Sequence, residues 1–587
     1  MDAPLNLLPM PREVTRGAGT APVRTPHVRR VSTLPAQGYE VRVRADAVEL
    51  DAADDAGEFY GWATFAQLVH THSDRSHPGV IPAGTLPVVT IRDWPDLPVR
   101  AVMLDVSRDK VPTMATVKDL VARLASWKVN QVQLYLEHTF AYEGHEAVWV
   151  DAGAFTPDEI RELDAWCAQH HVELVANQNC LGHMGRWLRH DRYRPLAMAP
   201  EGFTDHLGRT RAPMTVDPAN PGSLTLIRDL LGQLLPCFTS TRVHVGLDEP
   251  WEMPDERIGE YLDWITRLAA VPELAGRELL VWGDIVAGHP ERLAGLPDNV
   301  TICEWGYEEW WPFDERAATY AAAGTPFWVC PGTSSWTTIL GRTTNMRGDC
   351  IAAATAAAAH GGSGFLNTDW GDQGHLQYLP VSEPGFAFGA AVSWCLDANR
   401  DLDLAAALDA HAFDDEAGEL GRALVELGDV YRDVTPQVPN TSAVVLHLYY
   451  PQLTVGRGPT KGATAEEFLA ISRTLDSISS ALDRARPGRL DGGLVLDELR
   501  NAIALVRVLC ADAVARLGGD GTLESVGSDR REAFARDLEP VIVTHRALWL
   551  ARNRPGGLED SVAWLAHLHD CYERGATDRS WGSAYIG

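Results

Sequence analysis

The chain has 587 residues, which is too long for a single hydrophobic core, so we expect three domains. Hydrophobic residues make up 45% and charged residues 22%, the composition of an ordinary soluble globular protein. The formal charge is −29 and no basic run occurs, so the surface repels phosphate backbones and anionic lipids. We therefore expect no nucleic acid and no membrane among its partners.

The N-terminus reads MDAPLNLLPMPREV and lacks a basic segment followed by an apolar one, the pattern of a secretory signal. No stretch of eighteen apolar residues occurs either. The nine cysteines are scattered without a Cys-x-x-Cys spacing, which predicts free, mostly buried thiols and no cysteine-bound metal. We expect a cytoplasmic protein.

Residues 1–98 predict a small α+β domain. The segment GYEVRVRADAVEL, residues 38–50, alternates apolar and polar residues at the strand period, with a hairpin turn at Ala45-Asp46. It is followed by DDAGEFYGWATFAQL, residues 54–68, which has helical spacing. The turn-rich DWPDLP closes this part of the chain.

Residues 99–401 predict a (β/α)8 barrel. Short apolar runs alternate here with amphipathic stretches such as residues 113–127, 157–170 and 349–360. The runs are VMLDV (102–106), VQLYL (132–136), ELVA (173–176), VHVGL (243–247), LLVW (279–282), VTIC (300–303), FWVC (327–330) and GFLNT (364–368). Buried strands separated by helices form parallel sheets with right-handed crossovers, and eight strands close a TIM barrel.

Residues 402–587 predict a C-terminal α-helical domain. Apolar stripes at helical spacing occur in residues 465–484, 496–517 and 558–572. The pairs Pro487-Gly488 and Pro555-Gly556 separate these segments. We expect the domain to stabilise the barrel, to wall its pocket or to make subunit contacts, including a possible homodimer.

Functional residues of such a barrel lie where its strands end. Asp248 and Glu249 follow the fourth run, Glu137 the second, and Asn179 and His183 the third. The later runs end in or are followed by further candidates, namely Trp282, Trp305, Trp336, Trp370 and Asp372. Tryptophan rings stack on sugar faces and carboxylates bind hydroxyls or transfer protons, so this rim predicts a carbohydrate pocket. The alternative is that the aromatic side chains only fill the end of the barrel.

The adjacent acids Asp248 and Glu249 are the most informative residues about the function of the chain. Neighbouring side chains leaving a strand point in different directions, so the two carboxylates can serve two atoms of one ligand. Two acids in a row also occur in solvated loops and at helix N-termini. Their position at the end of the fourth strand favours the functional interpretation.

The segment RVHVGLDE resembles the signature of family 20 glycoside hydrolases, the β-N-acetylhexosaminidases, whose fourth strand ends in His-x-Gly-Gly-Asp-Glu. The segment from Asp93 through Arg100 to LDVSR (104–108) is similar to the start of that family's barrel, and Gly182-His183 matches its third strand. AGEFYGWATFAQL is similar to the helix of its small N-terminal domain. The resemblance covers residues 1–395.

The sequence departs from the family pattern at four places. Leu247 occupies the position of the second glycine of the signature, and residues 177–181 replace the usual Pro-Glu approach to Gly-His. The second strand ends in LYLEHTF without the family's His-x-His. SSW, residues 334–336, occupies the region of the strand-seven Tyr-x-Asp, so the donor to the acetamido oxygen is not identified.

The resemblance implies an exo-acting, retaining β-N-acetylhexosaminidase without cofactor or metal, acting on glycans that end in N-acetylhexosamine. In this family the 2-acetamido group of the substrate is the nucleophile. Asp248 would orient that group, Glu249 would be the general acid and base, and His183, oriented by Glu137, would tune Glu249. The implied substrate-binding residues are Arg100, Asn179, Trp282, Trp305, Trp336, Trp370 and Asp372.

Two other functions remain open from the residues. One is a barrel hydrolase of another type that acts on N-acetylglucosamine with an Asp-Asp pair. The other is a sugar-binding barrel that has lost turnover.

Overall fold

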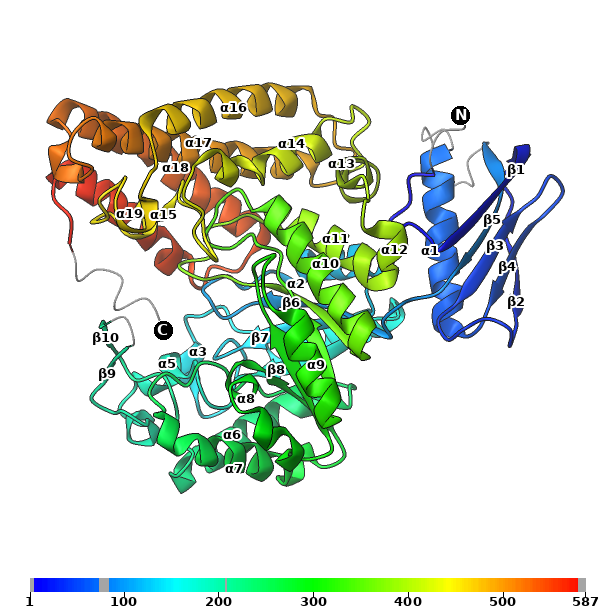
Figure 1. The fold of residues 1–587 in the computed structure, drawn as a ribbon, viewed down its shortest axis with the longest axis horizontal. Coiled ribbons are helices and arrows are strands. Elements are labelled where there is room, and N and C mark those ends of the chain that lie inside the picture. Colours follow the sequence, from blue (N-terminus) through cyan, green and yellow to red (C-terminus); the bar gives the residue numbers. More distant parts are fainter. Residues whose placement is uncertain (1–4, 73–83, 206–207, 579–587) are drawn as a thin grey trace.

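The computed structural model describes residues 5–72, 84–205 and 208–578. Figure 1 shows a sheet domain at the N-terminal end, a barrel surrounded by helices, and a group of long helices formed by the C-terminal part of the chain. The predicted fold class is therefore confirmed, whereas the domain limits at residues 98/99 and 401/402 stay predictions.

The N-terminal domain is a five-stranded sheet in the order β1-β5-β3-β4-β2, with one helix packed on it. Strands β3 and β4 pair antiparallel around a turn in which the Arg44 N–H donates to the Ala47 carbonyl at 2.9 Å, as the alternating pattern predicts. The bounds are β1 Glu13–Pro22, β2 His27–Arg30, β3 Tyr39–Val43, β4 Val48–Ala52, α1 Asp55–His72 and β5 Thr85–Asp93.

Eight parallel strands close into the barrel in the order β11-β12-β13-β14-β15-β6-β7-β8. Each of the eight predicted runs overlaps one of these strands. The bounds are β6 Val99–Asp105, β7 Gln131–Leu136, β8 Glu173–Gln178, β11 Arg242–His244, β12 Glu278–Trp282, β13 Val300–Trp305, β14 Phe327–Cys330 and β15 Gly364–Asp369. The fourth strand ends three residues earlier than its apolar run, because Gly246 and Leu247 have a left-handed backbone.

Helices surround the barrel, and several of their ends are set by capping residues. Helix α2 begins after Thr113, whose side chain accepts from the Thr116 N–H, and α4 begins with a capping box between Thr156 and Glu159. The main helices are α2 Met114–Ser126, α4 Pro157–Gln169, α6 Pro221–Leu234, α7 Ile258–Ala269, α9 Phe313–Ala323, α10 Thr343–His360 and α11 Leu379–Trp394. Short helices α3 Glu146–Trp149, α5 Gly185–Leu188 and α8 Asp284–Ala287 lie in the loops that follow strands β7, β8 and β12.

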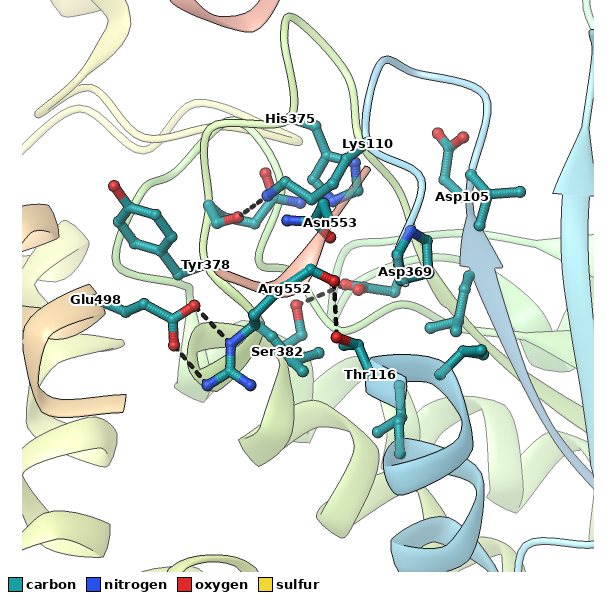
Figure 2. A pocket seen from close by; sticks show the side chains of 17 residues that line it. Asp105, Lys110, Thr116, Asp369, His375, Tyr378, Ser382, Glu498, Arg552 and Asn553 are labelled. Carbon is teal, nitrogen blue, oxygen red and sulfur yellow. Dashed lines mark hydrogen bonds and ion pairs between the residues drawn. The ribbon is translucent and has the colours of Figure 1, made fainter. Parts of the chain in front are cut away.

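The C-terminal helices pack on the barrel through a polar contact (Figure 2). Glu498 forms a bidentate ion pair with Arg552, with distances of 2.7 and 2.8 Å, and the main-chain oxygen of Arg552 accepts from the Thr116 hydroxyl of α2. Nearby, the Lys110 ammonium donates to the Gln377 carbonyl at 2.6 Å. The long helices are α14 Leu420–Leu427, α16 Ala465–Arg484, α17 Gly492–Leu517, α18 Ser528–Arg552 and α19 Leu558–Arg574.

All nine cysteines are buried and none is in a disulfide, as their spacing predicts. Within the described ranges, no helix combines the length and the apolar character that crossing a membrane requires.

Candidate active site

The loop after β11 has an unusual backbone that sets the directions of the two adjacent acids. Gly246, Leu247 and Glu249 have positive φ angles of 71°, 78° and 47°. A Cβ on Gly246 would lie 2.6 Å from the Asn179 side chain, so only glycine fits there. A left-handed backbone is unfavourable for a leucine. The Leu247 N–H donates to Oδ1 of Asn179 at 3.2 Å, and this hydrogen bond helps to hold the conformation. Asn179, which directly follows β8, thus fixes the loop.

Asp248 is a buried carboxylate with two polar partners. The Asn179 amide donates to its Oδ1 at 2.9 Å, and Nε2 of His183 lies 3.3 Å from its Oδ2. Burial favours the protonated acid, but the charge of His183 and the contacts with His183 and Asn179 outweigh it, so the pKa of Asp248 is below its ordinary value. Asp248 is therefore ionised at neutral pH.

His183 joins the two acids. Its Nε2 lies 3.3 Å from Asp248 and 3.5 Å from Oε2 of Glu249. Burial opposes its protonation, but the charge of Asp248 prevails, and the pKa of His183 is well above its ordinary value. Gly182 makes this close approach possible, because a Cβ there would lie 2.3 Å from the Asp248 carbonyl.

Arg108, three residues beyond the end of β6, lies between His183 and Glu137. Its Nη2 lies 3.3 Å from Nδ1 of His183, and its Nε lies 3.3 Å from Oε1 of Glu137. Glu137 is 3.9 Å from His183 and closer to the Tyr135 hydroxyl, which donates to it at 3.0 Å. Glu137 is therefore closer to Arg108 and Tyr135 than to its predicted partner His183.

An inner cavity of about 130 Å³ opens over this cluster. Eight of the predicted site residues line it, together with three that were not predicted. The predicted ones are His183, Asp248, Glu249, Trp282, Trp305, Trp336, Trp370 and Asp372, and the others are Arg108, Tyr307 and Asn440. The strand ends thus converge as the barrel arrangement predicts.

The aromatic wall of the inner cavity is held in place by hydrogen bonds. The Tyr307 hydroxyl accepts from the indole N–H of Trp370 at 2.7 Å, and Oδ1 of Asn440 accepts from that of Trp336 at 2.9 Å. Trp305 and Tyr307 stack with their ring centroids 5.3 Å apart. Asn440 belongs to the C-terminal region, so the pocket-walling role expected for that region is observed.

An outer groove of about 150 Å³ adjoins the inner cavity and shares Arg108, His183, Glu249 and Asp372 with it. The Glu249 side chain is 32% exposed, and its backbone N–H donates to Oδ2 of Asp284 at 3.1 Å. Asp248 lines only the inner cavity. The two acids therefore serve different spaces: Asp248 faces the interior and Glu249 lies at the border.

Two further acids near the site have raised pKa values. Burial, reinforced by the charge of Asp248, raises the pKa of Asp284 to about 7. Burial also raises the pKa of Asp372, although Arg108 opposes it. Both carboxyl groups can therefore carry a proton more readily than an exposed aspartate.

The structure contradicts the sugar-binding role predicted for Arg100. This residue is near the start of β6, at the end of the barrel opposite the site, and it is 1% exposed. Its guanidinium donates to the Lys128 and Leu97 carbonyls and to the Tyr60 hydroxyl. Arg100 therefore joins the N-terminal domain to the barrel, and Arg108 is the arginine at the rim.

Asn179 also differs from its prediction as a substrate-binding residue. Its side chain is fully buried beneath the loop, and its amide contacts Asp248 and the Tyr135 hydroxyl. It positions Asp248 and lines neither cavity.

Three residues of the site were not predicted, and their sequence signals differ. Arg108 ends the LDVSR segment directly after the first strand, so its place at the strand end could have identified it. Tyr307 follows Trp305 by two residues after the sixth strand. Asn440 lies in a loop of the C-terminal region and has no local signal.

Within the part of the chain that the structure describes, no group of potential metal ligands lies at the cavities. Among the described residues, the one group of His, Cys, Asp or Glu side chains close enough to hold an ion is His569, Asp570 and Glu573 on α19. None of these three residues lines the inner cavity or the outer groove.

Comparison with known proteins identifies two matched regions. Residues 5–94 match the model of glycosyl hydrolase family 20, domain 2, and residues 97–336 match that of the glycosyl hydrolase family 20 catalytic domain. A β-hexosaminidase of Porphyromonas gingivalis is 22% identical over 310 residues, which are 47% of this chain and 38% of the relative. Hexosaminidase D of Bos taurus is 27% identical over 228 residues, 35% of this chain and 62% of the relative. The chain spans less than half the length of the first curated relatives that it matches.

Solved structures share the fold. An exo β-N-acetylglucosaminidase of Vibrio harveyi in complex with N-acetylglucosamine has a TM-score of 0.56 at 16% identity, over 72% of this chain and 78% of that one. A mutant β-hexosaminidase of Streptomyces plicatus has a TM-score of 0.55 at 18% identity, over 70% and 96%. Because the two family models together match more than half of the sequence, the chain belongs to glycosyl hydrolase family 20.

Proposed function

We propose that the chain removes a terminal β-linked N-acetylhexosamine, GlcNAc or GalNAc, from a glycan or glycoside with retention of configuration. Family membership supports this reaction, and the relatives named β-hexosaminidase agree with it. In this family the substrate's own acetamido oxygen attacks the anomeric carbon, so a second catalytic carboxylate is not needed as nucleophile.

The observation that carries the proposal is the placement of Asp248 and Glu249 relative to the two cavities. Asp248 lines only the inner cavity, whereas Glu249 and His183 line both the inner cavity and the outer groove. A terminal sugar in the inner cavity and its leaving group in the outer groove would put the bond to be cleaved beside Glu249. The acetamido group of the same sugar would then face Asp248.

In this proposal Asp248 acts through its charge. Its low pKa keeps it ionised, and Asn179 and His183 hold it in one orientation. An ionised, preorganised carboxylate accepts the acetamido N–H and stabilises the positive charge that develops as the oxazolinium ring closes. Its oxygens are already held before substrate arrives, so little reorganisation is needed during the reaction.

Glu249 transfers the protons. It first donates a proton to the leaving oxygen, and its carboxylate then accepts one from the water that opens the oxazolinium ion. The side chain reaches both the outer groove and His183, so it contacts solvent and a titrating partner at the same time. The tryptophans and Tyr307 would stack on the sugar ring, and Arg108 and Asp372 would bind its hydroxyls.

Turnover of a panel of nitrophenyl glycosides tests the proposal. We expect activity on N-acetylglucosaminide or N-acetylgalactosaminide and none on glucoside or galactoside, which lack the acetamido group. Glu249→Gln should lose about 10²–10⁴-fold on substrates with poor leaving groups and much less on activated aryl glycosides, since these need no proton donor.

Glu256→Gln is the matched control, because this glutamate follows the same strand but is exposed and outside both cavities. Equal losses of Glu249→Gln on both substrate classes would contradict the acid role. An inert wild-type enzyme that still binds N-acetylglucosamine would favour the sugar-binding alternative.

A further inference from the structure

A third cavity, here called the side chamber, adjoins the outer groove. It has a volume of about 230 Å³ and shares Ser107, Asp109 and Arg186 with the groove. The remaining lining residues come from the loop after β7, from α3 and the residues that follow it, from the residue after α5, and from the start of α19. The inner cavity, the outer groove and the side chamber thus form a series of neighbouring spaces.

The C-terminal helices supply one wall of this chamber. The loop between α18 and α19 is wedged against the barrel: a Cβ on Gly557 would lie 1.9 Å from the Asp109 carbonyl, and the Arg554 N–H donates to the Val111 carbonyl at 2.8 Å. Figure 2 shows the residue that precedes this loop, Arg552, bonded to Thr116 on the barrel side. The wall is therefore held before any ligand binds. The matched family models end at residue 336, so this wall lies outside them.

The ion pairs of the chamber join the two parts of the chain. Arg186 on α5 contacts Asp109 at 2.8 Å and Asp560 on α19 at 3.1 Å. Burial raises the pKa of Asp109 to about 7, although Arg186 opposes the shift. With Arg189 and Asp151 also lining the chamber, cationic and anionic groups nearly balance. Such a lining favours a neutral ligand with many hydroxyl groups over an anion or a cation.

His138 provides an independent sign of a ligand. It lines the chamber and is 4% exposed, and its Nδ1 has no hydrogen-bond partner among the described residues. Burial holds its pKa well below the ordinary value, so the ring is neutral and offers one donor and one acceptor. A buried polar atom without a partner is costly. Because Nδ1 itself is covered and not accessible from the chamber, a sugar hydroxyl reaches it only when the His138 ring turns towards the chamber on binding.

We propose that the side chamber binds a neutral sugar unit of the same glycan whose terminal N-acetylhexosamine occupies the inner cavity. This inference rests on the proposed function and deepens it, since it assigns oligosaccharides, and not simple glycosides, as the preferred substrate class. The C-terminal helices then take part in substrate selection through Asp560 on α19 and the loop that precedes this helix. Arg186 and the carboxylates around it provide the hydroxyl contacts.

Hydrolysis of β-linked N-acetylglucosamine oligosaccharides, from disaccharide to pentasaccharide, tests the inference beside an aryl N-acetylglucosaminide. Ala147→Trp should fill the chamber from its exposed edge on α3, and Asp560→Asn should remove one carboxylate. Ala322→Trp on the exposed side of α9 is the matched control. We expect kcat/KM of the wild type to rise about tenfold or more along the series, which corresponds to about 1.4 kcal/mol.

Ala147→Trp should abolish that rise and leave the aryl glycoside within about twofold of wild type, and Asp560→Asn should reduce the rise. A wild type that shows no dependence on length, or an Ala147→Trp enzyme that retains the full rise, overturns the inference while the proposed function stands. A wild type inert on the aryl glycoside and on every oligosaccharide overturns the proposed function itself. The two failures are therefore distinguishable.

Discussion

Replacing Asn179 by alanine removes the two contacts that fix the loop carrying Asp248 and Glu249. The amide donates to Oδ1 of Asp248 at 2.9 Å, and the side-chain oxygen accepts from the Leu247 N–H at 3.2 Å. Without them Asp248 can rotate away from the position in which it would meet the acetamido group. Because Asn179 lines neither cavity, we expect kcat to fall more than KM changes.

The size of the effect follows from the bond to Asp248. A hydrogen bond to a charged group contributes about 1.5–3 kcal/mol. A change of about 1.4 kcal/mol in the barrier corresponds to tenfold in rate, so kcat should fall about 10- to 150-fold. The same bond helps to hold the pKa of Asp248 low, so its loss raises that pKa. Activity should then decline at a higher pH as the solution is acidified.

The assay is the pH dependence of kcat and KM on an aryl N-acetylglucosaminide. Asn177→Ala is the matched control: Asn177 is also fully buried on β8, but its amide donates to Gln133 at 3.0 Å and to no catalytic residue. Circular dichroism establishes that both variants are folded. An Asn179→Ala enzyme with wild-type kcat and an unchanged acidic limb would refute the positioning role, as would an equal loss in Asn177→Ala.

Two further changes have defined outcomes. Asp248→Asn should lower kcat about 10²–10³-fold even on activated aryl glycosides, because the acetamido group of the substrate loses the carboxylate that orients it. A loss confined to substrates with poor leaving groups would contradict this. Burial lowers the pKa of Lys110 from 10.5 to about 7, so between these pH values the unfolded chain binds one more proton than the folded chain, and stability due to this group rises with pH. Lys110→Met should therefore raise the free energy of unfolding by about 2–4 kcal/mol near pH 7. This gain is the removed penalty of the buried charge minus the stabilisation lost with the hydrogen bond to Gln377. The gain over wild type should disappear towards pH 10.5. Denaturant unfolding at several pH values measures this, and a gain independent of pH would contradict it.

The barrel could be predicted because its strands are buried on both faces and appear as apolar runs, each bounded by turns or amphipathic helices. The run at residues 243–247 extends three residues beyond the strand, since Val245 and Leu247 are apolar yet lie outside it. Leu247 is buried in a left-handed conformation, and hydrophobicity does not report backbone conformation. The acids that follow it were still placed at the correct strand end.

The site was less predictable at the first strand, where the wrong one of two nearby arginines was chosen, and where a residue distant in sequence reaches the cavity. Arg100 is near the start of β6 and Arg108 lies three residues beyond its end, and the direction of the strand decides which one reaches the rim. Asn440 reaches the cavity because the C-terminal helices pack over the barrel, a contact set by tertiary structure. No local pattern around Asn440 reports that contact.

Inhibition by an N-acetylglucosamine-derived thiazoline tests the central claim most directly, because this compound mimics the cyclic intermediate that only an acetamido nucleophile can form. The account predicts competitive inhibition of the wild-type enzyme about 10²-fold or more tighter than the binding of the corresponding substrate. It also predicts no covalent adduct when the enzyme is treated with a mechanism-based fluoro-sugar and examined by intact mass. A thiazoline without effect, together with a fluoro-sugar adduct on a carboxylate, would contradict it.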